Sequence, residues 1–348
     1  MTLQNSGEIK WSEISSEFGT PGGKNLGAYR VSDSPGNNCS LSNLPLDSGI
    51  PQSGEIKFSN FYGKSLNVVV NCHSGGTEYL INAKTNKWNN NAVTVIGRFR
   101  GKKEAGSRIL INVNKTFGAM SHGGNGFGDQ CAVKTGGWSS PAEVRVDVGG
   151  SGRLYGGGGA GGNGADGNRN GVQRGGGGTS GLGIQVNNCK VHVASGGIIR
   201  AGYAGGGGGG AGRQVDKGED RRATGGGGGG GAGLPAGGPG QPGAQNASKT
   251  DNTRRAVAGG AGGLNNAGGG GYGGIAGGNQ AYGGSGGNGG YLGAAGGGQA
   301  AGGNRGVSGG GAAGDIGAAI RKTAGFVVHL TSAAGATVIG SVDATGVS

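Results

Sequence analysis

The pattern of apolar and polar positions divides the chain into an apolar part and a glycine-rich part. Apolar runs are confined mainly to residues 66–148 and 184–200, with a short stretch at 326–339. Partly alternating β-branched residues, separated by Gly and Asn clusters, predict strands. These strands are Leu66–Val70, Val93–Ile96, Ile109–Val113 and Val144–Val148. We therefore expect a mostly β fold, with a small β-sandwich-like domain at residues 65–148.

A short internal repeat precedes this domain. Ser6–Ser12 (SGEIKWS) recurs as Ser53–Ser59 (SGEIKFS), and the two copies run on to Phe18-Gly19 and Tyr62-Gly63. In each copy Ile and the aromatic residue alternate with charged residues, which predicts a short strand with one buried face. The final Ser suits the N-cap of a helical turn. Because copies this small cannot form cores of their own, we expect residues 1–64 to dock onto the next domain or another protein.

A second repeat joins the β domain to the glycine-rich region. Val144–Val148 is followed by Gly149-Gly150, a short apolar segment and a glycine run. Val191–Val193 is followed in the same order by Gly196-Gly197, a short apolar segment and a glycine run. Glycine runs that begin directly at predicted strands indicate ordered structure, because a flexible linker would not need a strand and a turn before it.

Glycine makes up 96 of the 348 residues, and its longest runs are Gly205–Gly210 and Gly225–Gly231. Glycine loses more backbone entropy on ordering than any other residue, so this region is either disordered or held in an architecture that requires the absence of side chains. The non-glycine residues favour order, since Gly-Gly pairs separate them, as in Ala258, Ala261 and Leu264. A spacing of three is the repeat of the polyproline II helix.

A polyproline II helix makes no internal hydrogen bonds, so its N–H and C=O groups must pair with neighbouring runs. We therefore expect packed glycine helices at residues 149–320, followed by a C-terminal β tail at 321–348. Polar connectors separate the runs, at Asn163–Arg174, Arg213–Thr224 and Gln241–Arg255. They predict a chain that passes back and forth, with its longer loops gathered at one end. The alternative is a flexible linker; collagen would need a strict G-X-Y repeat and abundant proline.

Glycine runs with three-residue spacing, interleaved with diverse polar loops, resemble the polyglycine II sandwich of bacteriophage tail-fibre tip adhesins of the T-even type. The resemblance covers residues 150–315, and the SGEIK[WF]S repeats resemble segments that recur in phage tail-fibre and tail-tip proteins. The β domain is larger than a minimal fibre-attachment module.

The resemblance implies a virion component of the tail fibre or tail tip, synthesised in the host cytoplasm. It implies loops at the tip that bind a bacterial outer-membrane protein or lipopolysaccharide, and no catalysis. Other phage tail or fibre proteins are expected to bind residues 1–64. A homotrimer and a monomer on a trimeric shaft both remain open, as does a purely structural tail component without receptor contact. Few threonines are regularly spaced in the loops, which disfavours an ice-binding surface.

The formal net charge of +12 indicates an anionic partner. Arginines cluster in loops instead of in dense RGG repeats with aromatics, so no nucleic-acid partner is expected. We expect the loops to bind acidic and phosphate groups of a bacterial surface, with solvated loop charges as the alternative. The tyrosine among the candidates would either stack on sugars or pack in the glycine array. The candidate receptor-binding residues are Asn168, Arg169, Arg174, Lys217, Glu219, Arg221, Arg222, Lys249, Asp251, Arg254, Arg255 and Tyr282.

No motif indicates a catalytic centre, a metal or a cofactor. Asp166–Gly171 matches the first half of an EF-hand loop, but Gly177 occupies the position of the required Glu. The four cysteines are widely spaced and lack zinc-ligand spacing with the histidines, so free thiols are expected. The N-terminus lacks the apolar segment of a secretory signal, and no stretch is long and apolar enough to cross a bilayer.

Overall fold

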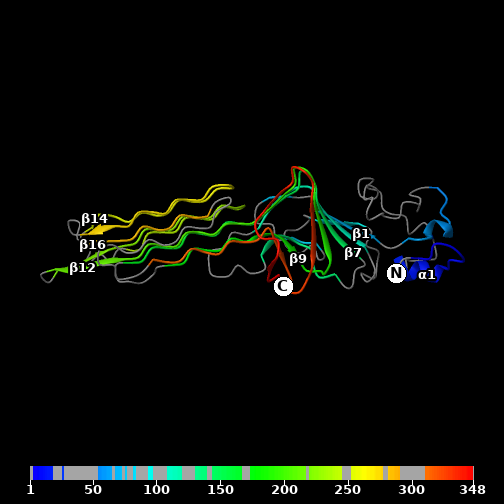
Figure 1. Ribbon diagram of the computed structural model, residues 1–348, viewed down its shortest axis with the longest axis horizontal. Coiled ribbons are helices and arrows are strands. Elements are labelled where there is room, and N and C mark those ends of the chain that lie inside the picture. Colours follow the sequence, from blue (N-terminus) through cyan, green and yellow to red (C-terminus); the bar gives the residue numbers. More distant parts are fainter. Residues whose placement is uncertain are drawn as a thin grey trace.

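The computed structural model describes residues 3–18, 26, 54–64, 67–72, 75–76, 81–83, 93–96, 108–119, 130–138, 143–166, 173–216, 219–244, 252–276, 281–290 and 310–347. Most of its regular elements are strands and few residues are helical, and the molecule is elongated: a helical N-terminal unit lies at one end, strands lie in the middle, and glycine-rich runs extend to the other end (Figure 1). No helix within these ranges is long and apolar enough to cross a membrane.

The N-terminal unit contains an α-helix and a 3-10 helix, and the middle of the molecule contains fifteen of the strands. The helices are α1 (Trp11–Phe18) and η3 (Phe58–Phe61). The strands are β1 (Asn67–Cys72), β2 (Ile81–Asn82), β3 (Val93–Ile96), β4 (Arg108–Val113), β5 (Thr116–Gly118), β6 (Cys131–Lys134), β7 (Glu143–Val148), β8 (Arg153–Tyr155), β9 (Ser180–Ile184), β10 (Cys189–Val193), β11 (Ile198–Arg200), β17 (Ile320–Lys322), β18 (Val328–Ser332), β19 (Thr337–Ile339) and β20 (Ala344–Thr345).

Each SGEIK repeat turns from its lysine into a helix, so the predicted short strands are wrong. The backbone N–H of Lys10 donates to the Glu13 carboxylate at 2.7 Å before α1. In the second copy the backbone N–H of Lys57 donates to the Asn60 side chain at 2.6 Å before η3. A side chain that reaches back to the N-cap N–H is half of a capping box and favours a helical start. Ser12, expected as the cap, lies inside α1.

The two copies pack against each other and supply one small core. Backbone hydrogen bonds join them, from Leu3 N–H to the Lys64 carbonyl at 2.8 Å and from Gly63 N–H to the Gln4 carbonyl at 2.9 Å. Apolar residues of both copies form the shared core: Leu3, Ile9, Ile14 and Phe61 are buried, with Trp11, Leu26, Ile56 and Tyr62 against them. The copies were expected to need another surface for burial, but each buries the apolar residues of the other.

The strands of the middle region coil into a three-sided parallel solenoid. Successive strands enter three sheets in rotation, so β4, β5 and β6 make one turn of the coil. The following turns are β7–β8–β9, β10–β11–β17 and β18–β19–β20. Neighbouring turns pair in parallel and in register: Ile111 lies opposite Val146, Val146 opposite Val191, and Val191 opposite Leu330. Only β3 pairs antiparallel within this stack, at the free edge of β1.

The strands expected at residues 65–148 are present as β1, β3, β4 and β7, but they form parallel sheets instead of the expected β-sandwich. A sandwich needs two antiparallel sheets. Here two consecutive strands of one sheet are separated in the sequence by one strand in each of the other two sheets. Alternation predicts one buried face correctly, as in β7, where Val144, Val146 and Val148 are buried between half-exposed charged residues. The alternation does not specify which other strand pairs with it in the sheet.

Apolar side chains from all three sides fill the solenoid. The core includes Phe117 and Leu154 from the second side and Leu182, Ile184 and Ile320 from the third. Cys72, Cys131 and Cys189 are free thiols buried in the same strands. Burial raises the pKa of the Cys72 and Cys189 thiols from an ordinary 9.0 to about 12.

The strand–glycine turn–strand repeat of the sequence is one corner of this coil. Gly152 N–H donates to the Gly149 carbonyl at 2.8 Å, and Gly197 N–H donates to the Ala194 carbonyl at 2.8 Å, one turn later. A third copy of the corner lies between β18 and β19, where Gly335 has a positive φ of 83°, as Gly196 has at 81°. Glycine adopts this left-handed conformation without steric cost.

The glycine-rich array leaves the solenoid at the next corner, between β8 and β9 and again between β11 and β17. Residues 149–200 and 320–345 therefore supply solenoid strands that precede, separate and follow the glycine runs in the sequence. The expected boundaries after residues 148 and 320 cut through this stack. The sequence showed strands before each glycine run, but not that the strands after the runs pair with them.

The array consists of extended runs that pass back and forth. The described runs are residues 156–165, 173–179, 201–211, 224–233, 237–243, 256–263, 268–274, 283–290 and 310–319. Each of the first eight runs is antiparallel to the one before it; for example, Gly202, Gly205 and Gly208 donate to Thr179, Gly176 and Gln173. The hydrogen bonds recur at every third residue, which is the repeat of the polyproline II helix, whereas a β ladder repeats at every second.

Gly225–Gly231 lies at the centre of the array. Its successive N–H groups donate in rotation to three neighbouring runs, 156–165, 283–290 and 256–263, at 2.8–3.0 Å. Its carbonyl oxygens accept in rotation from three more runs, 201–211, 237–243 and 268–274, at 2.7–3.0 Å. Every N–H and C=O group of the seven glycines is therefore paired.

This packing explains why the central run is pure glycine. A Cβ atom added at any position from Gly225 to Gly231 would lie less than 3.0 Å from the backbone of another run, a distance that real Cβ atoms essentially never show. At Gly238, on an outer run, an added Cβ would meet nothing within 4 Å. The longest glycine run is thus the one with neighbours on all sides.

Replacing Gly228 with Ala should prevent the array from closing, because the new methyl group would overlap the backbone of Gly206. Replacing Gly238 with Ala is the matched control, and its effect should stay within about 1 kcal/mol, with stabilisation possible through lower entropy of the unfolded chain. Hydrogen exchange of the amides of Gly225–Gly231 measures how far the packing of the array is lost in each variant. Equal protection of these amides in both variants would contradict the close packing.

Cys72 and Cys189 should resist alkylation at pH 8 in the folded protein and react in denaturant, because burial keeps the thiols protonated. The folded thiols also retain protons that the unfolded thiols lose above their ordinary pKa of 9.0, so the free energy of unfolding should fall as the pH rises from 9 towards 12. Mass spectrometry of the labelled peptides checks the first result, with an exposed cysteine introduced at Ser332 as the positive control.

Candidate functional site

The loops of the array meet at the end far from the solenoid (Figure 1). Short strands build this distal end: β12 (Gly212–Asp216), β13 (Glu219–Ala223), β14 (Asn252–Arg254), β15 (Ile275–Ala276) and β16 (Ala281–Tyr282). We use "distal end" for these strands together with Arg255. They come from three separate connectors between glycine runs, so the array brings together segments that are far apart in the sequence.

Strands β12 and β13 form a hairpin with charged residues in unfavourable register. Arg213 pairs with Arg222, and Asp216 pairs with Glu219 at the other end of the hairpin. Like charges at directly opposite positions of an antiparallel pair are destabilising. The backbone register therefore places like-charged residues opposite each other near both ends of the hairpin.

The other distal strands form a small sheet that packs on the hairpin base. Arg254 pairs with Ile275, and Ile275 pairs with Tyr282. A Cβ atom added at Gly212 would collide with the backbone of Tyr282, so the two units are in close contact. Ala223 and Ala281 are buried together at this contact.

The structure describes the candidate residues to different extents. Five of them lie outside the described residues: Asn168, Arg169, Lys217, Lys249 and Asp251. Glu219, Arg221 and Arg254 are placed by their backbone in the distal strands. Arg222 and Tyr282 are half-buried there, and Arg255 is exposed.

Arg174 differs from the other candidates because it joins two runs of the array. Its Nη2 atom lies 2.6 Å from Asp315 Oδ1, and its Nε donates to the Ala313 carbonyl at 2.9 Å. The partners lie about 140 residues away along the chain, so no local pattern could have identified them. Arg174 therefore joins runs 173–179 and 310–319.

Arg200 is an important residue that the sequence reasoning missed. It is 3% exposed, at the junction of the solenoid and the array. Burial lowers the pKa of its guanidinium, against the opposing effect of Tyr155 and Tyr203. The only sequence signal is its position directly after two isoleucines of β11, which predicts a strand but no partner.

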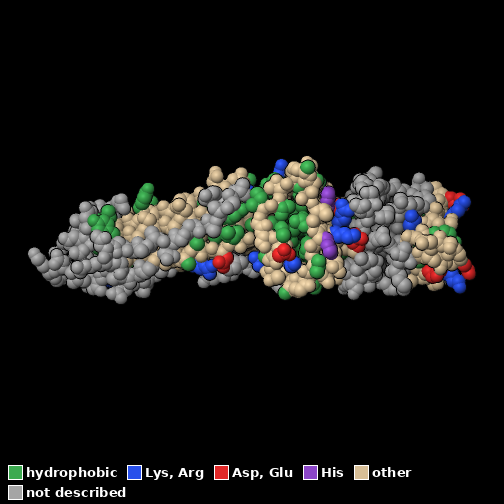
Figure 2. Space-filling view, viewed as in Figure 1, with side chains coloured by type: hydrophobic (Ala, Val, Ile, Leu, Met, Phe, Trp, Pro, Cys, Tyr) green, Lys and Arg blue, Asp and Glu red, His purple; other side chains and the backbone are tan. Residues whose placement is uncertain are grey.

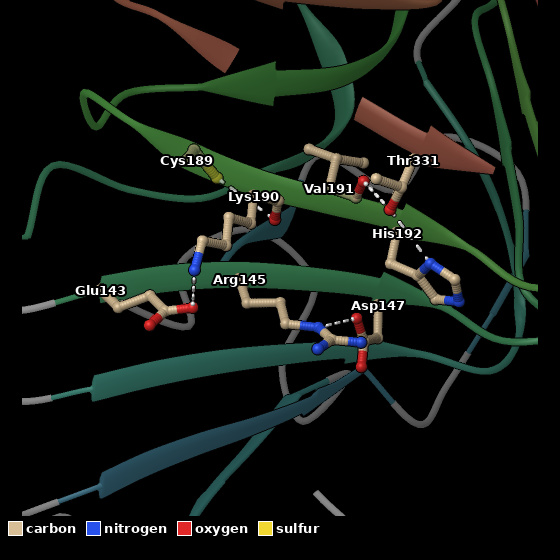
Figure 3. A network of polar contacts seen from close by, with 8 residues as sticks. All are labelled: Glu143, Arg145, Asp147, Cys189, Lys190, Val191, His192 and Thr331. Carbon is tan, nitrogen blue, oxygen red and sulfur yellow. Dashed lines mark hydrogen bonds and ion pairs between the residues drawn. The ribbon is translucent and has the colours of Figure 1, made fainter. Parts of the chain in front are cut away.

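The outer face of the solenoid carries a second polar cluster, shown in Figure 3. Lys190 Nζ lies 2.9 Å from Glu143 Oε1 on the neighbouring strand, and Arg145 Nε donates to an Asp147 oxygen at 2.5 Å. His192 Nδ1 lies 3.1 Å from the Thr331 hydroxyl. These side chains pair with one another across β7, β10 and β18. Within the described ranges no group of three or more His, Cys, Asp or Glu residues is placed to hold a metal ion.

The flank of the array differs in chemistry from its distal end. On the face shown in Figure 2, most of the visible described array is backbone and apolar side chain, while the described charged side chains lie mostly over the solenoid and the N-terminal unit. Val257, Leu264 and Tyr272 of the array are exposed, Tyr272 by 67%. Apart from the ion pair of Arg174 with Asp315, the runs described above thus carry few charged side chains, whereas two of the distal connectors are rich in charge.

Comparisons with known proteins find no match: not among protein-family models, not among curated proteins and not among solved structures. The geometry and the sequence pattern are therefore the basis for assigning a function.

Replacing Arg174 with Gln should loosen run 310–319 without unfolding the array. The ion pair is partly exposed, so the loss of stability should be at most about 1 kcal/mol. Hydrogen exchange at Gly311 and Gly314, whose N–H groups donate to run 201–211, should accelerate. Arg153→Gln, in β8, is the control for an exposed arginine. Unchanged exchange at both glycines would show that the ion pair does not hold the run.

Proposed function

We propose that this chain is a receptor-binding protein of a bacteriophage tail fibre or tail tip, with the distal end as its contact surface for a bacterial receptor. The observation that carries the proposal is the gathering of three separate connectors, two of them rich in charge, at one end of an array in which backbone groups are paired between runs. Loops on a rigid scaffold are where recognition residues are usually found. The receptor would be an outer-membrane protein or lipopolysaccharide.

We interpret the array as a polyglycine II sandwich of the kind found in T-even tail-fibre tip adhesins. The hydrogen-bond repeat of three and the rotation of bonds around Gly225–Gly231 support this interpretation. Such a lattice holds its loops without an apolar core. Its surface connectors can therefore vary in sequence without altering the packing of the runs.

The like-charge register of the distal hairpin supports a binding role. Arg213 and Arg222 lie directly opposite each other, so an acidic group of a partner would find two cationic residues at adjacent positions. Arg255 is exposed close to the same strands. We propose no catalysis and no cofactor for this surface.

The N-terminal unit is proposed as the attachment site for other tail or fibre proteins. It has its own small core and lies at the opposite end of the molecule from the distal strands (Figure 1). This separation would let one end bind the particle while the other reaches the host. Virion location and oligomeric state follow from the same proposal and are tested with it.

The purified protein should compete with particles for adsorption to host cells. The double variant Arg222→Ser, Arg255→Ser should compete at least about 10-fold less well, since a charge-assisted hydrogen bond contributes about 1.5–3 kcal/mol. Arg153→Ser, on the solenoid, should compete like the unmodified protein. Hydrogen exchange of Gly225–Gly231 verifies that each variant retains the array. If the unmodified protein fails to compete while particles still adsorb, the chain is a structural tail component instead.

A further inference from the structure

The array is joined covalently to the solenoid along one side only in the described chain. Four segments cross the junction, out of β8 and β11 and into β9 and β17. Hydrogen bonds join these crossing segments to one another, such as Gly156 N–H to the Arg200 carbonyl at 2.8 Å and Gly202 N–H to the Thr179 carbonyl at 2.9 Å. The runs at 224–243 and 256–274 instead reverse direction in turns near the solenoid.

These turns rest against the solenoid through side chains and close backbone packing. A Cβ atom added at Gly118, at the end of β5, would collide with the backbone of Leu234 in the first turn. The second turn contains Leu264 and Asn265, and Arg200 extends from β11 to reach it. The part of the array without a covalent connection is therefore joined to the connected runs by lateral hydrogen bonds, and it touches the solenoid itself at these two turns.

Arg200 makes three interactions that span the junction. Its Nη1 donates to Asn265 Oδ1 at 2.5 Å, and its Nη2 donates to the Leu264 carbonyl. On the solenoid side its guanidinium carbon lies 4.7 Å from the centre of the Tyr155 ring, within the range of a cation–π interaction. One side chain thus contacts the end of β8 and a turn of the array more than 60 residues away.

The burial of this arginine is costly, which argues that its contacts are specific. Transfer of an ionised group out of water is unfavourable unless it is paired. Among the described residues no carboxylate forms an ion pair with Arg200, and its buried Nε atom has no hydrogen-bond partner. An apolar side chain of similar length would fill the same space without this cost. It could not donate to a carbonyl and an amide oxygen.

We propose that Arg200 is a positioning residue that fixes the direction of the glycine array relative to the solenoid. It does so by binding the Leu264–Asn265 turn, which has no covalent connection of its own to the solenoid. The distal end lies at the far tip of the array (Figure 1), so a small rotation at the junction moves it through a much larger distance. The importance of this direction for receptor binding rests on the proposed function; the positioning itself does not.

Four variants of the full chain test the proposal: Arg200→Met, Arg200→Lys, Asn265→Ala and Asn266→Ala. The methionine keeps the length and loses both donors. The lysine keeps the charge but loses the planar fork that makes two hydrogen bonds at once. Asn265→Ala removes one acceptor. The adjacent Asn266→Ala is the matched control, because within the described ranges the hydrogen bond of Asn266 is made by its backbone carbonyl, which accepts from Gly263 N–H and is kept in the variant.

The direction of the array is measured by pulsed dipolar spectroscopy between spin labels at two exposed positions, Ser332 on the solenoid and Val257 on the array. Cys39 is replaced with Ser for these samples. Arg200→Met should at least double the width of the distance distribution, and Arg200→Lys should broaden it less. Asn266→Ala should leave it unchanged. A distribution as narrow in Arg200→Met as in the unmodified protein would overturn the proposal.

Hydrogen exchange separates loss of positioning from loss of folding. In Arg200→Met the amides of residues 263–268 should exchange at least 10-fold faster, while the amides of Gly225–Gly231 keep their protection. If this variant does not fold, Asn265→Ala decides: exchange at 263–268 should at least double, and unchanged exchange would overturn the proposal. Both measurements use the isolated protein. A failed adsorption assay would therefore contradict the proposed function and leave the positioning result standing.

Discussion

The structure depends on backbone hydrogen bonds that run sideways between extended glycine runs. Ordering one residue costs on the order of 1–2 kcal/mol, and one net hydrogen bond contributes about 0.5–1.5 kcal/mol. A single run could at best offset part of its own ordering cost. Gly225–Gly231 is ordered because six neighbouring runs pair all of its N–H and C=O groups at once. The array is therefore cooperative, and a side chain in its centre would separate several runs together.

The solenoid aligns the ends of the runs from which the array is built. Its stability comes from buried apolar side chains, such as those of Val146, Val191 and Leu182. Four segments of the array continue directly from or into its strands, so their ends are fixed at neighbouring positions. Two kinds of stabilisation are thus combined in one chain: the hydrophobic effect in the coil, and hydrogen bonding without an apolar core in the array.

This division has a consequence for the distal end. Since the array is stabilised by its backbone, the connectors need not contribute to a large core, and they can carry closely spaced like charges, such as Arg213 opposite Arg222. Arg174 and Arg200 show the contrary use of arginine. Both pair with groups of the same chain, across a run boundary and across the junction. Position in the architecture, more than residue type, distinguishes a structural arginine from a candidate contact residue.

The sequence by itself determined the local features: the main strands of the solenoid, the three-residue glycine repeat, and the alternation of runs and connectors. These follow from short-range physics, namely which side chains fit a pleated strand and which backbone can pack without a Cβ. Only the tertiary structure decided that the strands coil into a solenoid, that the array is inserted within it, and that the repeats at the N-terminus share a core. It also paired Arg200 with Asn265 and Arg174 with Asp315. An alternating pattern specifies that a face is buried but not which strand lies beside it, and contacts across tens of residues leave no mark in the local sequence.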